Sequence, residues 1–192
     1  MNLKTLALGA YQTNCYILSN GSEAVVIDPG YEPDTILDAL EGLTLKAILL
    51  THGHFDHVGA VKELVAETGC AVYIHAAEAT MPPMMTAGTL YYTHTYDEGD
   101  TISPIAGLEL KVLHTPGHTP GSVCLLWNNE LFAGDTLFAG SCGRVDLPGG
   151  DPALMLRSLD RLAALETDYR VHPGHGPATM LSHEKRHNPY LR

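Results

Sequence analysis

Short apolar runs separated by turn residues open the chain, and similar runs return in its second half. Runs of this length between Gly, Asn and Pro clusters are typical of strands. The run Lys46–Thr51 is apolar at nearly every position, which is the pattern of a strand buried on both faces. Strands are predicted at Leu3–Leu8, Cys15–Leu18, Ala24–Ile27, Lys46–Thr51, Ala71–Ile74, Leu108–Leu113, Val123–Trp127, Glu130–Ala133 and Tyr169–His172.

Apolar residues at helical spacing lie between several of these strands. The clearest helix is predicted for Asp151–Leu165, with Asp151 as the N-cap and Pro152 at the first helical position. Weaker patterns predict helices at residues 33–40, 58–67 and 181–187. Since no linker, charge block or clear repeat interrupts the chain, we expect one α/β domain over residues 1–192.

Residues 79–104 break this rhythm and are rich in methionine, proline and tyrosine. Such a stretch, above all residues 81–96, can line an adaptable substrate groove or lid, or it can cover the core. For the methionines we expect core cover.

Composition and charge narrow the function classes. The 192 residues are 45% hydrophobic, and 11 Lys and Arg face 22 Asp and Glu, a formal charge of −11. Such a surface repels nucleic acids and anionic membranes, so neither is an expected partner. The N-terminal apolar run is too short for a signal peptide, and four cysteines form no C-x-x-C pair. A cytoplasmic protein is expected; its oligomeric state has no sequence signal.

The chain contains 11 histidines. Three of them lie in the motif HGHFDH together with one aspartate. His52 and His54 follow an apolar strand, and residues two apart in an extended segment face the same way, so both imidazoles can reach one metal ion. Asp56 and His57 follow where the chain turns into a helix, so they face elsewhere. This arrangement favours two ions side by side.

Three later turns carry the same kinds of side chain. In HTPGHTPGS, proline and glycine forbid a helix, so one histidine is expected to act as a ligand, and His118 in the bend is favoured over His114. Asp135 ends a predicted strand, a common place for chemistry in α/β proteins. In HPGHGP, His175 is favoured over His172, which continues a strand.

The order HGHFDH, HTPGHTPGS, AGDTLF and PGHGP resembles the metallo-β-lactamase-fold hydrolases. The segments GDTLFAGSCGRVDLPGGD and GPATMLSHEKRHNP resemble the glyoxalase II (hydroxyacylglutathione hydrolase) branch, in its short single-domain form. The resemblance covers nearly the whole chain and implies an αββα sandwich with the site at one edge. It implies one metal held by His52, His54 and His118, a second held by Asp56, His57 and His175, and Asp135 bridging both.

The reaction expected from this resemblance is hydrolysis of a thioester such as S-lactoylglutathione or a related thiol conjugate, a small-molecule substrate. Two divalent ions would supply a bridging hydroxide. The ligand types suit zinc, and they also suit iron or manganese. Asp56 and Asp135 would orient the hydroxide while binding metal. A thiolate leaves without a strong general acid, and none is assigned in the sequence.

Two features qualify the substrate. Glyoxalase II proper carries a C-terminal helical region that helps to hold glutathione, and this chain stops at Arg192, so glutathione specificity is not implied. Arg144 matches a basic position that contacts a substrate carboxylate in that family; it can equally pair with Asp146 to fix the loop. Cys142 has no partner base and is not expected to be a nucleophile.

Other functions start from the same residues. A persulfide dioxygenase would use one iron on His52, His118 and Asp135, which leaves the second group without a role. The missing signal peptide disfavours a secreted β-lactamase, and the charge disfavours a nuclease. A metal-binding protein without hydrolase activity is disfavoured because structural zinc sites are rich in cysteine.

Overall fold

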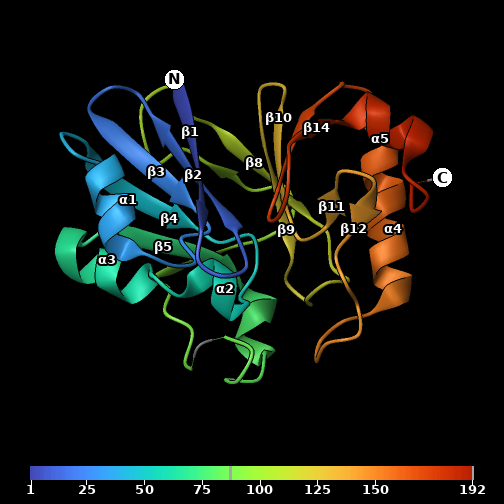
Figure 1. The fold of residues 1–192 in the computed structure, drawn as a ribbon, viewed down its shortest axis with the longest axis horizontal. Helices are drawn as coiled ribbons and strands as arrows, with labels where there is room; N and C mark the ends of the chain where they lie inside the picture. The colour runs from blue at the N-terminus through green and yellow to red at the C-terminus, as the bar shows by residue number, and fades with distance from the viewer. Residues whose placement is uncertain (87, 192) are drawn as a thin grey trace.

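Two six-stranded sheets face each other and carry helices on their outer sides (Figure 1). The structure is a computed structural model that describes residues 1–86 and 88–191. The first sheet has the order β1 (Asn2–Leu8), β2 (Thr13–Ser19), β3 (Glu23–Ile27), β4 (Thr44–Leu49), β5 (Ala71–His75) and β6 (His94–Tyr96). The second has the order β14 (Thr179–Met180), β13 (Arg170–Pro173), β10 (Glu130–Gly134), β9 (Val123–Trp127), β8 (Leu110–His114) and β7 (Thr101–Ile102). A small hairpin pairs β11 (Leu137–Phe138) with β12 (Ser141–Cys142).

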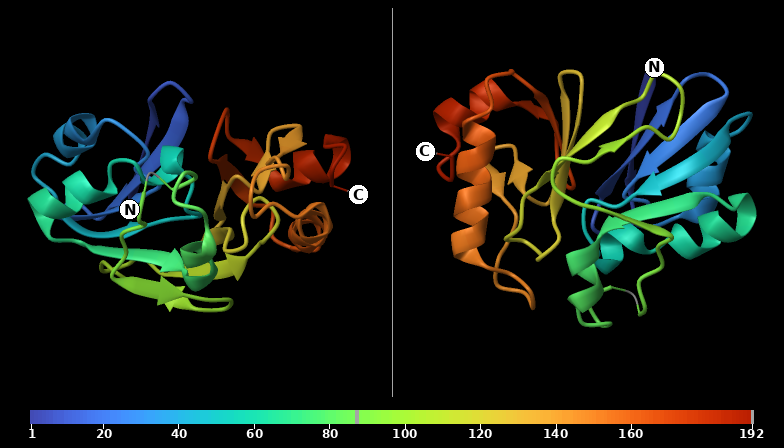
Figure 2. Two further views of the ribbon diagram at one scale, coloured as in Figure 1. Left: turned by 90° about the horizontal axis from the view of Figure 1, so that it is seen from below. Right: turned by 180° about the vertical axis from the view of Figure 1, so that it is seen from behind.

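Helices cover the two outer faces (Figure 2). On the first sheet lie α1 (Pro33–Ala39) and α3 (Val61–Thr68), and on the second lie α4 (Pro152–Ala163) and α5 (Leu181–His187). Separate apolar clusters fill the spaces between helices and sheets, and a third, which contains Phe132, fills the space between the sheets. The αββα sandwich implied by the family resemblance is therefore confirmed. No helix among the described residues is long and apolar enough to cross a membrane.

The start of α4 follows the predicted capping pattern. The Asp151 side chain accepts hydrogen bonds from the backbone N–H groups of Ala153 and Leu154, at 2.8 and 3.0 Å. These bonds satisfy donors that a helix leaves unpaired at its N-terminus, and such a cap stabilises by about 1 kcal/mol. The helix then buries Met155, Leu159 and Leu162 against the second sheet.

The helix predicted for residues 58–67 is present over most of its length, but it begins three residues later than predicted. The chain forms a short helix α2 (Phe55–Val58) and then α3, with a break between them. The N–H of Ala60 donates to the carbonyl oxygen of Pro29 at 3.0 Å instead of continuing the α2 ladder. The turn after β3 thus docks on this point and ends the first helix early.

The irregular region 79–104 divides its methionines between core and surface. Met81 is buried, as expected for core cover, but Met84 is 82% exposed, and Met85 lines the cavity described below. The region also holds β6 and β7, and a short 3₁₀ helix η1 (Ala76–Thr80) extends into its first two residues; the pattern predicted none of the three. Strands of two or three residues carry too little periodicity to be recognised.

Candidate metal centre

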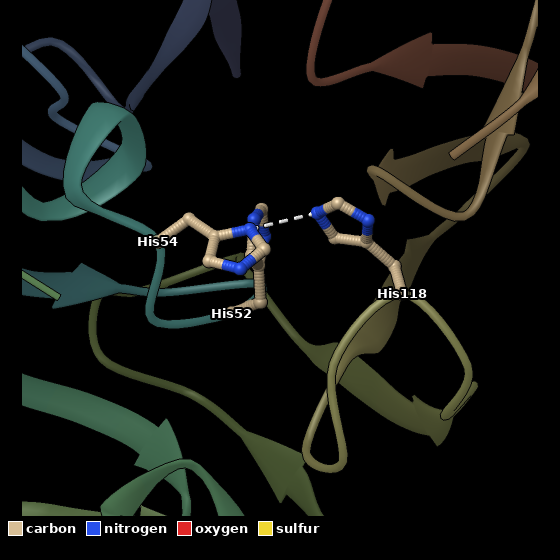
Figure 3. A group of neighbouring side chains, drawn as sticks. All are labelled: His52, His54 and His118. Carbon is tan, nitrogen blue, oxygen red and sulfur yellow. Dashed lines mark hydrogen bonds between the residues drawn. The ribbon is translucent and has the colours of Figure 1, made fainter. Parts of the chain in front are cut away.

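The loops after β4 and β8 bring three histidines together (Figure 3). His52 and His54 come from the first sheet and His118 from the second, and all three are buried. One nitrogen from each lies within 4.8 Å of the others, and His54 Nδ1 is 2.8 Å from His118 Nε2. We call His52, His54 and His118 the three-histidine group.

A second cluster, the mixed group, contains Asp56, His57 and His175, whose ligand atoms also lie within 4.8 Å of one another. Asp56 and His57 lie on α2, and His175 follows β13. The His175 Nε2 atom is 3.2 Å from Asp56 Oδ2 and 3.4 Å from His57 Nε2.

Asp135 lies between the two groups. Its Oδ2 atom is 3.4 Å from His118 Nε2 and 3.5 Å from His175 Nε2, and its Oδ1 atom is 3.4 Å from His57 Nε2. A Cβ at Gly174 would lie 2.1 Å from Asp135 Oδ1, so only glycine leaves room for the carboxylate there. One carboxylate therefore faces both groups, as a bridging ligand requires.

Strand direction explains why these loops meet. Strands β8 and β10 both run antiparallel to β9, and β13 runs parallel to β10, so all three end at the same edge of the second sheet. Each is followed by a turn that carries His118, Asp135 or His175. The two sheets join at this edge, where the N–H of Val123 donates to the carbonyl oxygen of Thr51 at 2.9 Å.

Hydrogen bonds at the far ring nitrogens orient four of the histidines, among them His52, whose Nδ1 is 3.2 Å from the Thr51 hydroxyl oxygen. His57 Nδ1 is 3.0 Å from Asp28 Oδ2, while His118 Nδ1 donates to the carbonyl oxygen of Arg144 at 2.8 Å and His175 Nδ1 donates to that of Tyr11 at 3.1 Å. In each case Nε2 is left to face the cluster. Such outer bonds fix ring orientation and tautomer at metal sites.

Unpaired buried atoms test whether this centre fits metal ions. Among the described residues, the buried side-chain atoms without a hydrogen bond are His52 Nε2, His54 Nε2 and Asp135 Oδ1. Buried polar atoms are almost always paired, so His52 Nε2 and Asp135 Oδ1 call for a partner, whereas His54 faces His118 through Nδ1 and its unpaired Nε2 lies on the other edge of the ring. Imidazole nitrogens and a carboxylate oxygen are donors to a divalent cation, so the residues fit the group.

Comparison with known proteins supports the same assignment. The family model described as "Metallo-beta-lactamase superfamily" matches residues 8–175 of the chain. The chain belongs to the metallo-β-lactamase superfamily. A curated relative, the hydroxyacylglutathione hydrolase GloC of Haemophilus influenzae, is 32% identical over 100% of this chain and 98% of its own length.

Solved structures of this superfamily superpose closely on the chain. The B3 metallo-β-lactamase BLEG-1 is 38% identical with a TM-score of 0.91, and 99% of each chain is covered. TTHA1623 in a di-iron-bound form is 40% identical with a TM-score of 0.86, over 98% of this chain and all of its own. ETHE1 from Myxococcus xanthus is 29% identical with a TM-score of 0.84, over 100% of this chain and 84% of its own. A metal-binding hydrolase of this superfamily is the assignment that these likenesses support.

Burial and charge set the protonation states within the superfamily site. Burial lowers the pKa of His54 to about 4, and burial together with the neighbouring imidazoles lowers the pKa of His52 well below its usual range. Burial alone would also lower the pKa of His57, but the carboxylates of Asp135 and Asp28 hold it well above the ordinary value. His52 and His54 are thus held as neutral imidazoles, whereas carboxylate charge acts on His57 in the mixed group.

A cavity of about 620 Å³ opens beside both groups. His54, Asp56, His118, Asp135 and His175 reach it from the ligand groups. Its other lining side chains are mostly apolar or aromatic. These are Tyr11, Phe55, Met85, Phe138, Ser141, Cys142, Arg144 and Leu147.

Arg144 lies at this cavity and forms an ion pair. Its Nε and Nη2 atoms donate to the two Asp146 carboxylate oxygens at 2.7 and 2.8 Å, and its side chain is 60% exposed. The loop-fixing pair expected as one alternative is present, and the exposed guanidinium still borders the cavity. Burial raises the pKa of the Cys142 thiol at the same wall, which makes it a poorer nucleophile.

Two histidines fall outside the centre, as favoured from the sequence. His114 Nε2 donates to the carbonyl oxygen of Pro120 at 2.9 Å and its ring stacks on His75, while His172 pairs with Glu130. Cys15, Cys70 and Cys124 are buried. The sequence reasoning missed Asp28, although an aspartate directly after the strand Ala24–Ile27 repeats the signal that had pointed to Asp135.

Proposed function

We propose that this chain is a two-metal hydrolase that cleaves thioesters of small acylated thiols. The observation that carries the proposal is the pair of ligand groups sharing Asp135 beside an apolar-walled cavity. His52, His54 and His118 would hold one divalent ion, and Asp56, His57 and His175 the other, with Asp135 between them. We infer zinc from the donor atoms, with iron or manganese as the alternatives, because the same donors bind all three.

When bound, two cations would supply a water of lowered pKa and would polarise an acyl carbonyl. The protein's own contribution is orientation. The carboxylates of Asp56 and Asp135 face the space between the groups and can accept hydrogen bonds from the attacking water. Asp56 Oδ2 is itself held by the Thr13 hydroxyl, which donates at 3.3 Å.

The cavity wall favours a good leaving group. Among its described lining residues, every histidine and every carboxylate belongs to the two ligand groups or is Asp135, which lies between them. No further side chain of those two kinds is available there to protonate a departing atom. A thiolate, whose parent thiol has a pKa of about 8.5, departs without such help, whereas an amine does not.

The apolar wall favours an acyl-thiol with an apolar portion next to the scissile bond. Phe55 and Phe138 come from α2 and β11, so both halves of the molecule contribute to it. Arg144 at the border could bind a substrate carboxylate if it leaves Asp146. We place the protein in the cytoplasm, where its four free cysteines remain reduced.

The test is a substrate panel on protein of known metal content. Purified chain is assayed with S-lactoylglutathione, an S-acyl cysteamine, a β-lactam chromophore and, with oxygen uptake recorded, glutathione persulfide. We expect about two metal equivalents and a kcat/KM for one of the thioesters at least about tenfold above that for the β-lactam, a difference of about 1.4 kcal/mol in barrier.

Two results would overturn the proposal. Faster β-lactam hydrolysis would follow the likeness to BLEG-1 instead. A single iron with oxygen uptake on persulfide and no thioester cleavage would establish the dioxygenase, which needs only His52, His118 and Asp135.

A further inference from the structure

A buried carboxylate outside both ligand groups lies directly behind the three-histidine group. Glu78, on the short helix η1, is 0% exposed. Its Oε2 atom accepts the backbone N–H of Gly53 and its Oε1 atom accepts that of Gly121, each at 2.6 Å. A buried charge is tolerated only with such bonds, and bonds of this kind are short and strong.

The two N–H donors come from the two loops that carry the three-histidine group. Gly53 lies between His52 and His54, and Gly121 lies three residues after His118. One carboxylate therefore ties the ligand loop of the first sheet to that of the second. The separation of these two loops therefore sets the distance of His118 from His52 and His54.

The glycines themselves are explained by this carboxylate. A Cβ at Gly53 would lie 2.9 Å from Glu78 Oε2, and a Cβ at Gly121 would lie 2.8 Å from Glu78 Cγ. Neither glycine has a positive φ, so space rather than backbone conformation requires them. Glu78 and the two glycines thus form one packing unit.

The mixed group is held by other residues, one of which, Asp28, also reaches His52: Asp28 Oδ2 accepts from the Thr51 hydroxyl, which lies 3.2 Å from His52 Nδ1. Asp28 contacts His57, and the Tyr11 carbonyl oxygen accepts from His175. The mixed group also contains its own carboxylate, Asp56, whereas the three-histidine group has none. A cation among the three imidazoles is balanced by the shared Asp135, by Asp28 near His52 and by the Glu78 carboxylate behind the two loops.

We propose that Glu78 is a positioning residue for the three-histidine group. Its carboxylate holds the two ligand loops at one separation and places a buried negative charge behind them. It therefore strengthens cation binding at the three-histidine group and not at the mixed group. The inference rests on the two-metal site of the proposed function but not on the thioester as substrate.

The experiment measures zinc affinity at each group separately. His175→Ala leaves the three-histidine group intact, and His118→Ala leaves the mixed group intact. Each metal-free protein is titrated with zinc against a chromophoric chelator, with and without the substitution Glu78→Gln. This substitution keeps the size of the side chain but removes its charge and turns an amide N–H toward a backbone N–H. We expect the zinc Kd to rise at least about tenfold in the His175→Ala background, at the scale of outer partners of metal ligands, and less than about threefold in the His118→Ala background.

Glu184→Gln is the matched control. Glu184 is also buried and also accepts a backbone N–H, that of Gly140, at 2.8 Å, but it belongs to α5 and contacts neither ligand loop. We expect it to change the zinc Kd less than about threefold in both backgrounds. If Glu78→Gln does not fold by circular dichroism, Glu78→Asp is titrated in the same way; it keeps the charge but is too short to reach both loops, and the same selective weakening is expected.

Equal weakening in the two backgrounds, or no weakening, would overturn the role of Glu78 while leaving the two-metal hydrolase in place. Absence of zinc binding in the His175→Ala protein would overturn both. Failure of thioester hydrolysis with selective zinc weakening intact would overturn only the proposed substrate.

Discussion

The two ligand groups share one carboxylate but are held in opposite ways. Every member of the three-histidine group is at most 3% exposed, and the clamp behind it is Glu78, which bonds only to the loops and not to the histidines. In the mixed group the acidic residues contact the ligands directly, and the His175 side chain is 27% exposed at the cavity. The three-histidine group is thus held by burial and by hydrogen bonds to the backbone of its loops. The mixed group is held by its own charged side chains beside the cavity.

Metal removal tests both groups at once and has the largest expected effect. Treatment with a chelator should abolish hydrolysis and should lower the free energy of unfolding by about 2.7 kcal/mol for each metal site, relative to protein at a metal concentration of 100 Kd. Activity assays and thermal unfolding before and after zinc is restored measure both effects. Full activity in metal-free protein would refute the hydrolase.

Asp135→Asn should produce the next largest effect, because it removes the charge that both groups share. We expect kcat to fall by about 10²- to 10³-fold, the scale of losing one preorganised electrostatic partner, and the zinc content to fall below two equivalents. Elemental analysis and steady-state kinetics measure these changes. Asp146→Asn, the same change at an exposed carboxylate, serves as the control and should keep the zinc content of the wild type.

Asp28→Asn should weaken zinc binding more at the mixed group than at the three-histidine group, because Asp28 contacts His57 directly and reaches His52 through Thr51. Asp28 contacts His57 through Oδ2 and holds the N–H and hydroxyl of Thr51 at 2.7 and 2.6 Å. Loss of its charge should weaken zinc at the mixed group by about 10- to 100-fold, as outer partners of metal ligands do. The same chelator titration in the two single-group backgrounds measures it, and a larger effect at the three-histidine group would break the comparison.

The smallest effects are expected at the exposed Arg144–Asp146 pair, since surface ion pairs contribute about 0–1 kcal/mol to stability. If Arg144 binds substrate, Arg144→Ala should raise KM for an acyl-thiol with a free carboxylate by about tenfold with kcat kept, as loss of a charged contact does. Asp146→Ala should then lower KM, because it frees the guanidinium. An increase in KM for both variants would show that the pair only fixes the loop.

The elements that the pattern predicted well are those of five or more residues with an apolar face. α4 and its Asp151 cap, α5 and most strands of five residues or more lie within two residues of the prediction. The break between α2 and α3 was missed because the bond from Ala60 to Pro29 joins segments far apart in the chain. For the same reason Met84 and Met85, which look alike in the sequence, could not be distinguished from the buried Met81.

The ligand types and their spacing could be read from the sequence, because strand geometry constrains residues two apart and proline and glycine constrain turns. The seven residues expected at the centre do come together, while His114 and His172 lie apart from it. The outer partners could not be read in this way. Asp28, Tyr11 and Glu78 act through contacts with residues more than twenty positions away, and one of them acts through its carbonyl oxygen, which carries no side-chain signal.

By itself, then, the sequence determined the chemistry: histidines and aspartates at strand ends, in a chain with apolar strands enough for two sheets. The tertiary structure alone decided how these residues are grouped, which carboxylate is shared, and which buried charge stands behind each group. The physical reason is the distance along the chain over which each kind of constraint acts. Backbone geometry ties side chains a few residues apart, but the placement of Asp135 between two groups and of Glu78 between two loops depends on how two sheets pack.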